Sequence, residues 1–296
     1  MKKTTTEVKI SKSFLKKALD LAGEINARAV FIYADVCPSI ELIEKRKDQT
    51  DIYLIARTKK VLKDAEKIAR KVLLVPNIPL TRMGQIKIAV MMAVSQNLLK
   101  KGDRVVCLSG VPKFGFLDTL VTVEIGKEFE MLTSDRIIDF TKDVDPKVFE
   151  ELVRIAVEIG SEGIEGKSVG TCFVMGDADE VLRHSRQMIL NPFKGYSEEK
   201  RNILKCDLKD TIKEFAQLDG AFIIRKDGTI ETAGSFLKAS LIKEVLPQGW
   251  GARHHSAAAI TSITKAIAIT VSQSTGDVRI FKGGYPVMEI EKPSKT

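Results

Sequence analysis

The chain has 296 residues, which is long enough for two ordinary domains that each bury a hydrophobic core. Hydrophobic residues make up 44% of it and charged residues 29%, a balance that is typical of a folded globular protein and excludes a largely disordered one. The net charge of +8 suggests a nucleic-acid partner, but Lys and Arg occur mostly as pairs at predicted helix ends, interspersed with acids, so we expect a solvated surface and no nucleic-acid binding.

The first half of the chain alternates segments whose apolar residues follow helical and strand-like spacing. Short, nearly all-apolar strands separated by helices predict a parallel sheet that is covered by helices on both faces. Thr81 is the candidate N-cap of the last predicted helix of this half. In chain order we predict a helix over 11–25, a strand over 29–33, a helical stretch near 40, a strand over 52–56, a helix over 58–71, a strand over 72–75, a helix over 81–100 and a strand over 104–109.

Charged, turn-prone sequence interrupts this rhythm before Pro146, which is a good helix start with acids at its positive end. We therefore predict a first α/β domain over 1–126, a linker over 127–145 and a second domain over 146–296. The second domain is expected to contain a helix over 146–159, a strand over 168–175, a helix near 208–215, a strand over 221–224 that turns at 226–229 into a return strand over 230–233, a helix over 256–264 and a strand over 267–271.

No segment suggests a membrane or an oxidising compartment. The start of the chain leads into an amphipathic segment, and no apolar run reaches bilayer length, so we expect a cytoplasmic protein without a membrane partner. The cysteines form no CxxC pair and are expected to be reduced core thiols rather than a zinc site; they are Cys37, Cys107, Cys172 and Cys206.

Asp219, Gly220 and Ala221 stand at the mouth of a predicted apolar strand. A carboxylate there can hold Mg²⁺ or Mn²⁺ against phosphate oxygens, which are ligands that these hard cations prefer. Gly220 would let the backbone approach a nucleotide closely. Taken alone, the tripeptide favours a strand-initiating Asp-Gly turn over a metal site.

Arg253, His254 and His255 lie at the start of a predicted helix. Cationic side chains are unfavourable there unless an anion joins them, because the helix dipole is already positive at that end. Arg253 would bind two phosphate oxygens in bidentate fashion, and His254 would donate to a phosphate or to departing pyrophosphate. The alternative is a histidine pair packed at a domain surface.

In this order and spacing, the two segments resemble the diadenylate cyclase domain, whose signature motifs are DGA and RHR. The resemblance covers residues 147–285 and implies a mixed-sheet α/β domain that joins two ATP molecules into the second messenger cyclic di-AMP and releases pyrophosphate. It implies Asp219, Arg253 and His254 as catalytic residues, Asp219 as the ligand of Mn²⁺ or Mg²⁺, and a homo-oligomer in which two protomers face each other. Nucleotide-binding residues implied by it are Gly220, Ala221, Phe236, Leu237, His255, Ser256, Ser272, Gln273 and Ser274.

The chain departs from the common pattern of that family at two positions. Ala252 and His255 stand where Thr and Arg usually flank Arg-His, and Ser256 is the candidate source of the missing hydroxyl. These departures leave open a second hypothesis, a non-catalytic adenine-nucleotide sensor on the same fold. For the residues expected to line the pocket, ordinary packing at strand ends is the alternative.

The first half resembles the C-terminal domain of pyruvate kinases through residues 101–112 and 118–123. That resemblance implies a regulatory or assembly role for residues 1–126. Together with residues 169–177 and 191–193, it makes the whole chain look like the soluble archaeal-type members of the diadenylate cyclase family.

Overall fold

The computed structural model describes residues 5–37, 50–67, 71–75, 77, 80–127, 144–239, 246 and 249–292. The chain divides into two compact units, Met1–Thr133 and Ser134–Thr296. This division falls inside the range predicted as the linker, most of which lies outside the described residues, as does the helix predicted near residue 40. The roles assigned to the two ranges stay predictions.

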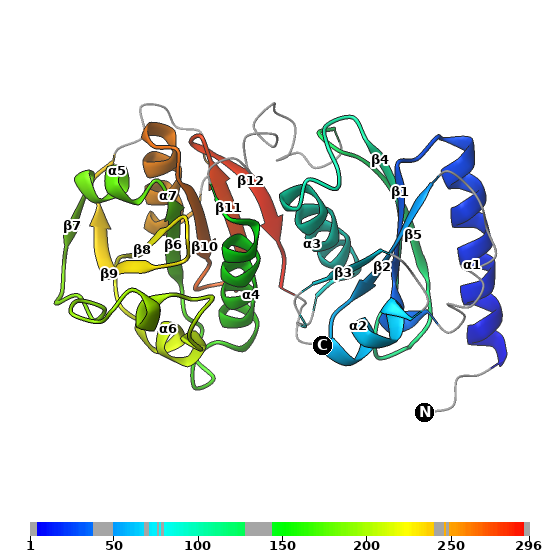
Figure 1. The fold of residues 1–296 in the computed structure, drawn as a ribbon, viewed down its shortest axis with the longest axis horizontal. Helices are drawn as coiled ribbons and strands as arrows, with labels where there is room; N and C mark the ends of the chain where they lie inside the picture. Colours follow the sequence, from blue (N-terminus) through cyan, green and yellow to red (C-terminus); the bar gives the residue numbers. More distant parts are fainter. Residues whose placement is uncertain are drawn as a thin grey trace. The chain divides into compact units, whose positions relative to one another are not determined.

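The first unit is a five-stranded sheet with helices on both sides (Figure 1). Its elements are α1 (Thr5–Glu24), β1 (Ala29–Tyr33), η1 (Ala34–Val36), β2 (Asp51–Ala56), α2 (Lys59–Glu66), β3 (Val72–Leu74), α3 (Arg82–Ser95), β4 (Arg104–Ser109) and β5 (Thr119–Glu124). The strand order is β3-β2-β1-β4-β5, and α1 and α3 lie on opposite sides of the sheet (Figure 1). The predicted N-cap is confirmed, since Thr81 Oγ1 accepts a hydrogen bond from the backbone N–H of Gly84 at 2.9 Å.

One edge of this sheet differs from the predicted all-parallel arrangement. The pairs β1–β2, β1–β4 and β2–β3 are parallel, but β4 and β5 are antiparallel, with Arg104 opposite Glu124. The physical reason is the short connection over 110–118, because a parallel pair needs a crossover of a dozen or more residues.

The second unit is built on a seven-stranded mixed sheet, so the predicted α/β fold class is confirmed. Its strand order is β12-β11-β10-β6-β8-β9-β7; β6 and β8 are parallel and the other pairs are antiparallel. Its elements are α4 (Pro146–Glu162), β6 (Thr171–Gly176), α5 (Ala178–Arg183), β7 (Ser185–Gln187), η4 (Glu199–Arg201), α6 (Lys209–Phe215), β8 (Ala221–Arg225), β9 (Ile230–Leu237), α7 (Ala252–Ile263), β10 (Ile267–Val271), β11 (Val278–Lys282) and β12 (Tyr285–Ile290).

Alternation along β6 divides the core of this unit between the two faces of the sheet. Cys172 and Val174 belong to the buried cluster that includes Ala257 and Ala258 of α7. Phe173 points the other way and contacts Phe222, with ring centroids 5.0 Å apart. The small residues of α7 therefore bring this helix close to the sheet.

No described helix has the length and apolar character needed to cross a bilayer.

Candidate active site

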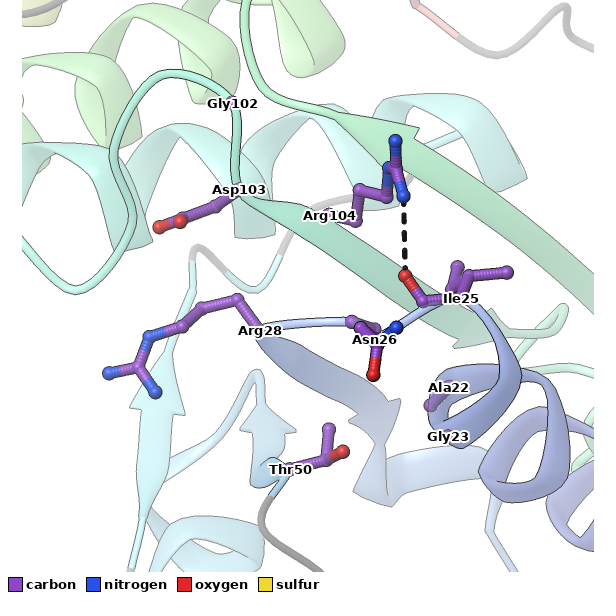
Figure 2. Close-up of a pocket in the computed structure, with 10 residues that line it drawn as sticks. Ala22, Gly23, Ile25, Asn26, Arg28, Thr50, Gly102, Asp103 and Arg104 are labelled. Carbon is purple, nitrogen blue, oxygen red and sulfur yellow. Dashed lines mark hydrogen bonds between the residues drawn. The ribbon is translucent and has the colours of Figure 1, made fainter.

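A groove of about 720 Å³ lies in the first unit, at the amino ends of β1 and β4. Figure 2 shows its two arginines extending in different directions, with Arg104 donating to the carbonyl of Ile25 at 3.4 Å. Arg28 pairs with Asp51 at 3.0 Å, and Arg104 pairs with Glu124 at 3.3 Å. The guanidinium groups do not converge and already have carboxylate partners, so this groove does not present a pair of converging cations to a ligand.

A second cavity, of about 210 Å³, lies between the start of α7, the start of β8 and the end of β9. It brings together residues that are distant in sequence but were predicted as one site. The predicted residues that line it are Asp219, Gly220, Ala221, Phe236, Leu237, Arg253 and Ser256, and they are joined by Cys172, Met188, Ser235 and Ala252.

Asp219 and Arg253 meet at this cavity. Arg253 Nη2 lies 3.3 Å from Asp219 Oδ1, and the Asp219 side chain is 85% exposed. The described residues contain no cluster of three or more His, Cys, Asp or Glu side chains that could hold a metal. A lone exposed carboxylate nevertheless fits Mg²⁺ or Mn²⁺, because Mg²⁺ is often held by one or two carboxylates together with substrate phosphates.

The fold itself requires glycine at position 220, whether or not a nucleotide is bound. Its φ is +101°, and a Cβ there would lie 2.7 Å from the backbone carbon of Gly234 and the nitrogen of Ser235. A larger residue would therefore collide with β9. The sequence identified the residue, but the close approach that the structure shows is to the neighbouring strand.

The first turn of α7 places its residues on different faces. Its N-cap is Gly251, which has no side-chain capping bond. Ala252, Arg253 and Ser256 line the cavity, so the Ser256 hydroxyl is available on the face where Ala252 presents only a methyl group. His255 is exposed and does not line the cavity.

His254 faces the core of the unit. It is 5% exposed, and its Nε2 accepts a hydrogen bond from Arg279 Nη1 at 3.1 Å. Burial, followed by the charge of Arg279 and the neighbouring His255, lowers the pKa of His254 to about 4, so the ring is neutral near pH 7. The predicted direct donation to a phosphate is therefore not supported by this geometry, and its catalytic role stays a prediction.

The predicted segment Ser272 to Ser274 follows β10 and lies beside the cavity without lining it. Ser272 Oγ and Ser274 Oγ are 3.2 Å apart. A Cβ on Gly170 would lie 2.9 Å from Gln273 Cβ and 3.2 Å from Arg253 Nη1, which places both Gln273 and Arg253 next to this glycine.

Several lining residues were not predicted as site residues. Cys172 was assigned to the core, and burial does raise the pKa of its thiol to about 12, yet it also borders the cavity. Met188 begins an apolar run, Met188 to Leu190, that the structure shows to be exposed; the run itself is the signal in the sequence that could have identified Met188.

The fold and the site define a class of protein: a mixed α/β domain with a carboxylate and an arginine at a helix N-terminus, suited to binding a nucleotide phosphate. Comparison with protein families agrees with this class. Residues 158–285 match the DAC model, described as DisA bacterial checkpoint controller nucleotide-binding, and residues 11–133 match a model described as probable sensor domain DacZ_P.

Two archaeal relatives give the specific family. The chain is 34% identical to a diadenylate cyclase of Methanocaldococcus jannaschii, across 95% of this chain and 97% of the relative. It is 36% identical to a diadenylate cyclase of Haloferax volcanii, across 70% of this chain and 75% of the relative. The chain therefore belongs to the diadenylate cyclase family and is an enzyme of that kind.

Likeness to solved structures is weaker. A double mutant of DacA from Staphylococcus aureus matches 50% of this chain and 87% of its own at 21% identity and a TM-score of 0.33. A pyruvate kinase from Cryptosporidium parvum matches 42% of this chain and 23% of its own at 22% identity and a TM-score of 0.32. At these scores neither bears on function, and the resemblance of the first unit to pyruvate kinases stays a prediction.

Proposed function

We propose that the enzyme condenses two ATP molecules into cyclic di-AMP and two pyrophosphates. The observation that carries the proposal is the contact of Arg253 with Asp219 at a cavity that opens beside the start of α7. A cation, a carboxylate and the amino end of a helix in one place suit a metal-bound triphosphate.

In the proposed reaction, the 3′-hydroxyl of each ATP attacks the α-phosphorus of the other. One P–O bond forms, the bond to pyrophosphate breaks, and the hydroxyl proton leaves to solvent. Asp219 would hold Mn²⁺ or Mg²⁺, which neutralises phosphate charge when bound. Arg253 would exchange its contact with Asp219 for phosphate oxygens and stabilise the charge that develops on them, and Ser256 would donate from the same helix face.

The apolar side of the cavity would take the adenine. Ala221, Leu237 and Met188 provide aliphatic surface, and Phe236 provides a ring that is 45% exposed. A cavity of about 210 Å³ is smaller than the roughly 300–1,000 Å³ of a typical ligand pocket, so it suits part of one nucleotide rather than two.

A second protomer would therefore supply the other ATP. Beside the cavity, Met188 and Ile189 are 47% and 40% exposed, and Leu190 is 95% exposed. Exposed apolar side chains that continue from a substrate pocket favour contact with another protein surface, here a facing copy of the chain. We include in the proposal a homo-oligomer, a cytoplasmic location and a regulatory or assembly role for the first unit.

A non-catalytic adenine-nucleotide sensor is the second candidate. It is favoured by Ala252, which gives the cavity a methyl group where the family usually has a hydroxyl, and by His255, which does not line the cavity. Such a sensor would bind ATP or cyclic di-AMP and leave both intact.

The decisive experiment is mass-resolved product analysis after the purified chain is incubated with ATP and Mn²⁺. We expect cyclic di-AMP from the parent and at least a roughly 100-fold loss, the effect of removing one transition-state contact, in Asp219→Asn. Its stability should change by less than about 1 kcal/mol, because the carboxylate is exposed. Asp179→Asn, an exposed carboxylate on α5 that does not line the cavity, is the matched control and should keep full activity.

ATP left intact at every protein concentration would refute the cyclase proposal, and binding without turnover would favour the sensor. Product formation by Asp219→Asn at the parent's rate would remove Asp219 from the mechanism.

A further inference from the structure

Arg279 is a buried cation that lies behind the proposed site, on β11. It is 9% exposed. Its guanidinium carbon lies 4.5 Å from the centre of the Trp250 ring, and its Nη1 lies 3.1 Å from His254 Nε2. Nη2 contacts Glu289 and lies 3.6 Å from Asp277. Two carboxylates, an aromatic face and an imidazole therefore surround one guanidinium.

The contact with Arg279 determines where the His254 ring carries its proton. A guanidinium only donates and remains protonated, so His254 Nε2 must accept and the ring hydrogen must lie on Nδ1. The charged groups around this ring are Arg253 and His255 on its own helix and Arg279 on β11, while Trp250 and Phe281 cover it with uncharged rings. Burial opposes protonation of the ring most strongly, and the neighbouring positive groups add to this effect.

The same cluster fixes the beginning of α7. Trp250 precedes the Gly251 N-cap, and its ring lies 5.3 Å from the His254 ring and 6.0 Å from Phe281. The backbone N–H of His254 donates to Gly251 O at 3.0 Å. Gly251 has no side chain to cap the helix, so the first turn is stabilised instead by the packing of Trp250 and His254 on Arg279.

Arg253 directly precedes His254 in that turn and lies on the face that lines the cavity. Its guanidinium reaches the Asp219 carboxylate at 3.3 Å, while the side chain of His254 points into the core. A shift of His254 would therefore move the backbone that carries Arg253. Displacement of a substrate-binding group by about 1 Å can lower a rate by about 100-fold.

We propose that Arg279 is a positioning residue of the nucleotide site, which holds His254 as a neutral ring protonated on Nδ1 and thereby fixes the turn from which Arg253 reaches the phosphates. The inference deepens the proposed function and rests on it. It gives His254 a role that its buried position allows, in place of direct contact with the leaving group.

The test combines histidine NMR with steady-state kinetics. The chain contains three histidines, so ¹⁵N-histidine spectra of the parent can be assigned with His184 and His255 variants. We expect His254 to carry its hydrogen on Nδ1 and to remain neutral down to about pH 5, consistent with a pKa lowered to about 4. A ring protonated on Nε2, or one that titrates near 6.5, would overturn the inference.

The kinetic variants are Arg279→Met and Arg279→Lys. We expect Arg279→Met to lower kcat/KM for ATP by about 100-fold, mainly through KM. Its activity should also begin to fall at a higher pH than that of the parent, because loss of the Arg279 charge raises the pKa of the still buried His254. Arg279→Lys keeps the charge and should regain part of the activity. A parent-like pH profile in Arg279→Met would also overturn the inference.

The control is Arg201→Met, which removes a comparably covered arginine that contacts Ile230 O at 2.6 Å and Glu231 at 3.0 Å and does not line the cavity. It should keep the parent's KM and pH profile. If Arg279→Met does not fold, the tautomer of His254 in the parent and the pH profile of kcat/KM in Arg279→Lys still test the inference. If no chain makes cyclic di-AMP, weaker binding of ATP with Mn²⁺ by Arg279→Lys than by Arg201→Met would uphold the positioning role while the proposed function fails.

Discussion

Replacement of Gly220 by alanine separates backbone conformation from packing at the mouth of the cavity. A residue other than glycine at φ +101° costs about 1–3 kcal/mol. The added Cβ would also lie 2.7–2.8 Å from three backbone atoms of Gly234 and Ser235, and overpacking of this kind costs about another 1–3 kcal/mol. Since backbone cannot rotate aside as a side chain can, β9 must shift. We therefore expect Gly220→Ala to lose about 2–6 kcal/mol of unfolding free energy.

Gly195→Ala is the matched control. Gly195 has φ +91°, but a Cβ added there would meet no atom within 4 Å, so only the conformational cost of about 1–3 kcal/mol applies. Urea unfolding followed by fluorescence is specific to the second unit, because Trp250 is the chain's only tryptophan. Equal destabilisation by the two substitutions would refute the argument that contact with β9 requires glycine at position 220. A greater loss of unfolding free energy in Gly220→Ala, together with reduced cyclase activity at urea concentrations below its unfolding transition, would support the argument.

Two further predictions concern groups whose pKa values are shifted by burial. His254 has a folded-state pKa of about 4, below the ordinary 6.5, so its contribution to stability is complete above pH 6.5 and is lost as the pH falls toward 4. We expect this residue to contribute about 2 kcal/mol less to the unfolding free energy at pH 5 than at pH 7.5. The unfolding free energy of His254→Gln should therefore depend less on pH than that of a His184→Gln control. The Cys172 thiol, with its pKa raised to about 12, should resist iodoacetamide at pH 8 until the chain unfolds, whereas the partly exposed Cys206 should react first in peptide mass mapping; early modification of Cys172 would contradict its burial.

Strands and helices could be predicted closely from hydrophobic periodicity, because a strand buried on both faces of a sheet must be apolar throughout. The predicted strand over 29–33 is β1, every residue of which is buried. The helix predicted over 146–159 begins at Pro146 with an Asp145 N-cap, as its sequence indicates, and continues to Glu162. β5 was not among the predicted strands, and its antiparallel pairing differs from the predicted parallel sheet because apolar alternation does not encode the direction in which a strand pairs.

For the site, motifs identified residues but not the directions of their side chains. Asp219 and Arg253 meet as the resemblance implied, although 34 positions separate them. Arg253 and His254 were grouped as phosphate-binding cations because they are adjacent in sequence, whereas adjacent residues on a helix point about 100° apart. The hydrogen-bond partner of His254 is Arg279, which lies 25 positions away and belongs to no recognised motif.

This arrangement changes how the cationic segment at the start of α7 should be understood. The argument from the helix dipole required an anion to balance the cations there. Of Arg253, His254 and His255, however, only Arg253 lines the cavity. His254 is neutral because it is buried and because it lies beside a cation, Arg279, that is itself balanced by Glu289 and Asp277. The positive charge directed at a bound nucleotide therefore comes from one guanidinium and the helix amides. It follows that removing Arg253 should weaken ATP binding far more than removing His255, which is exposed and does not line the cavity.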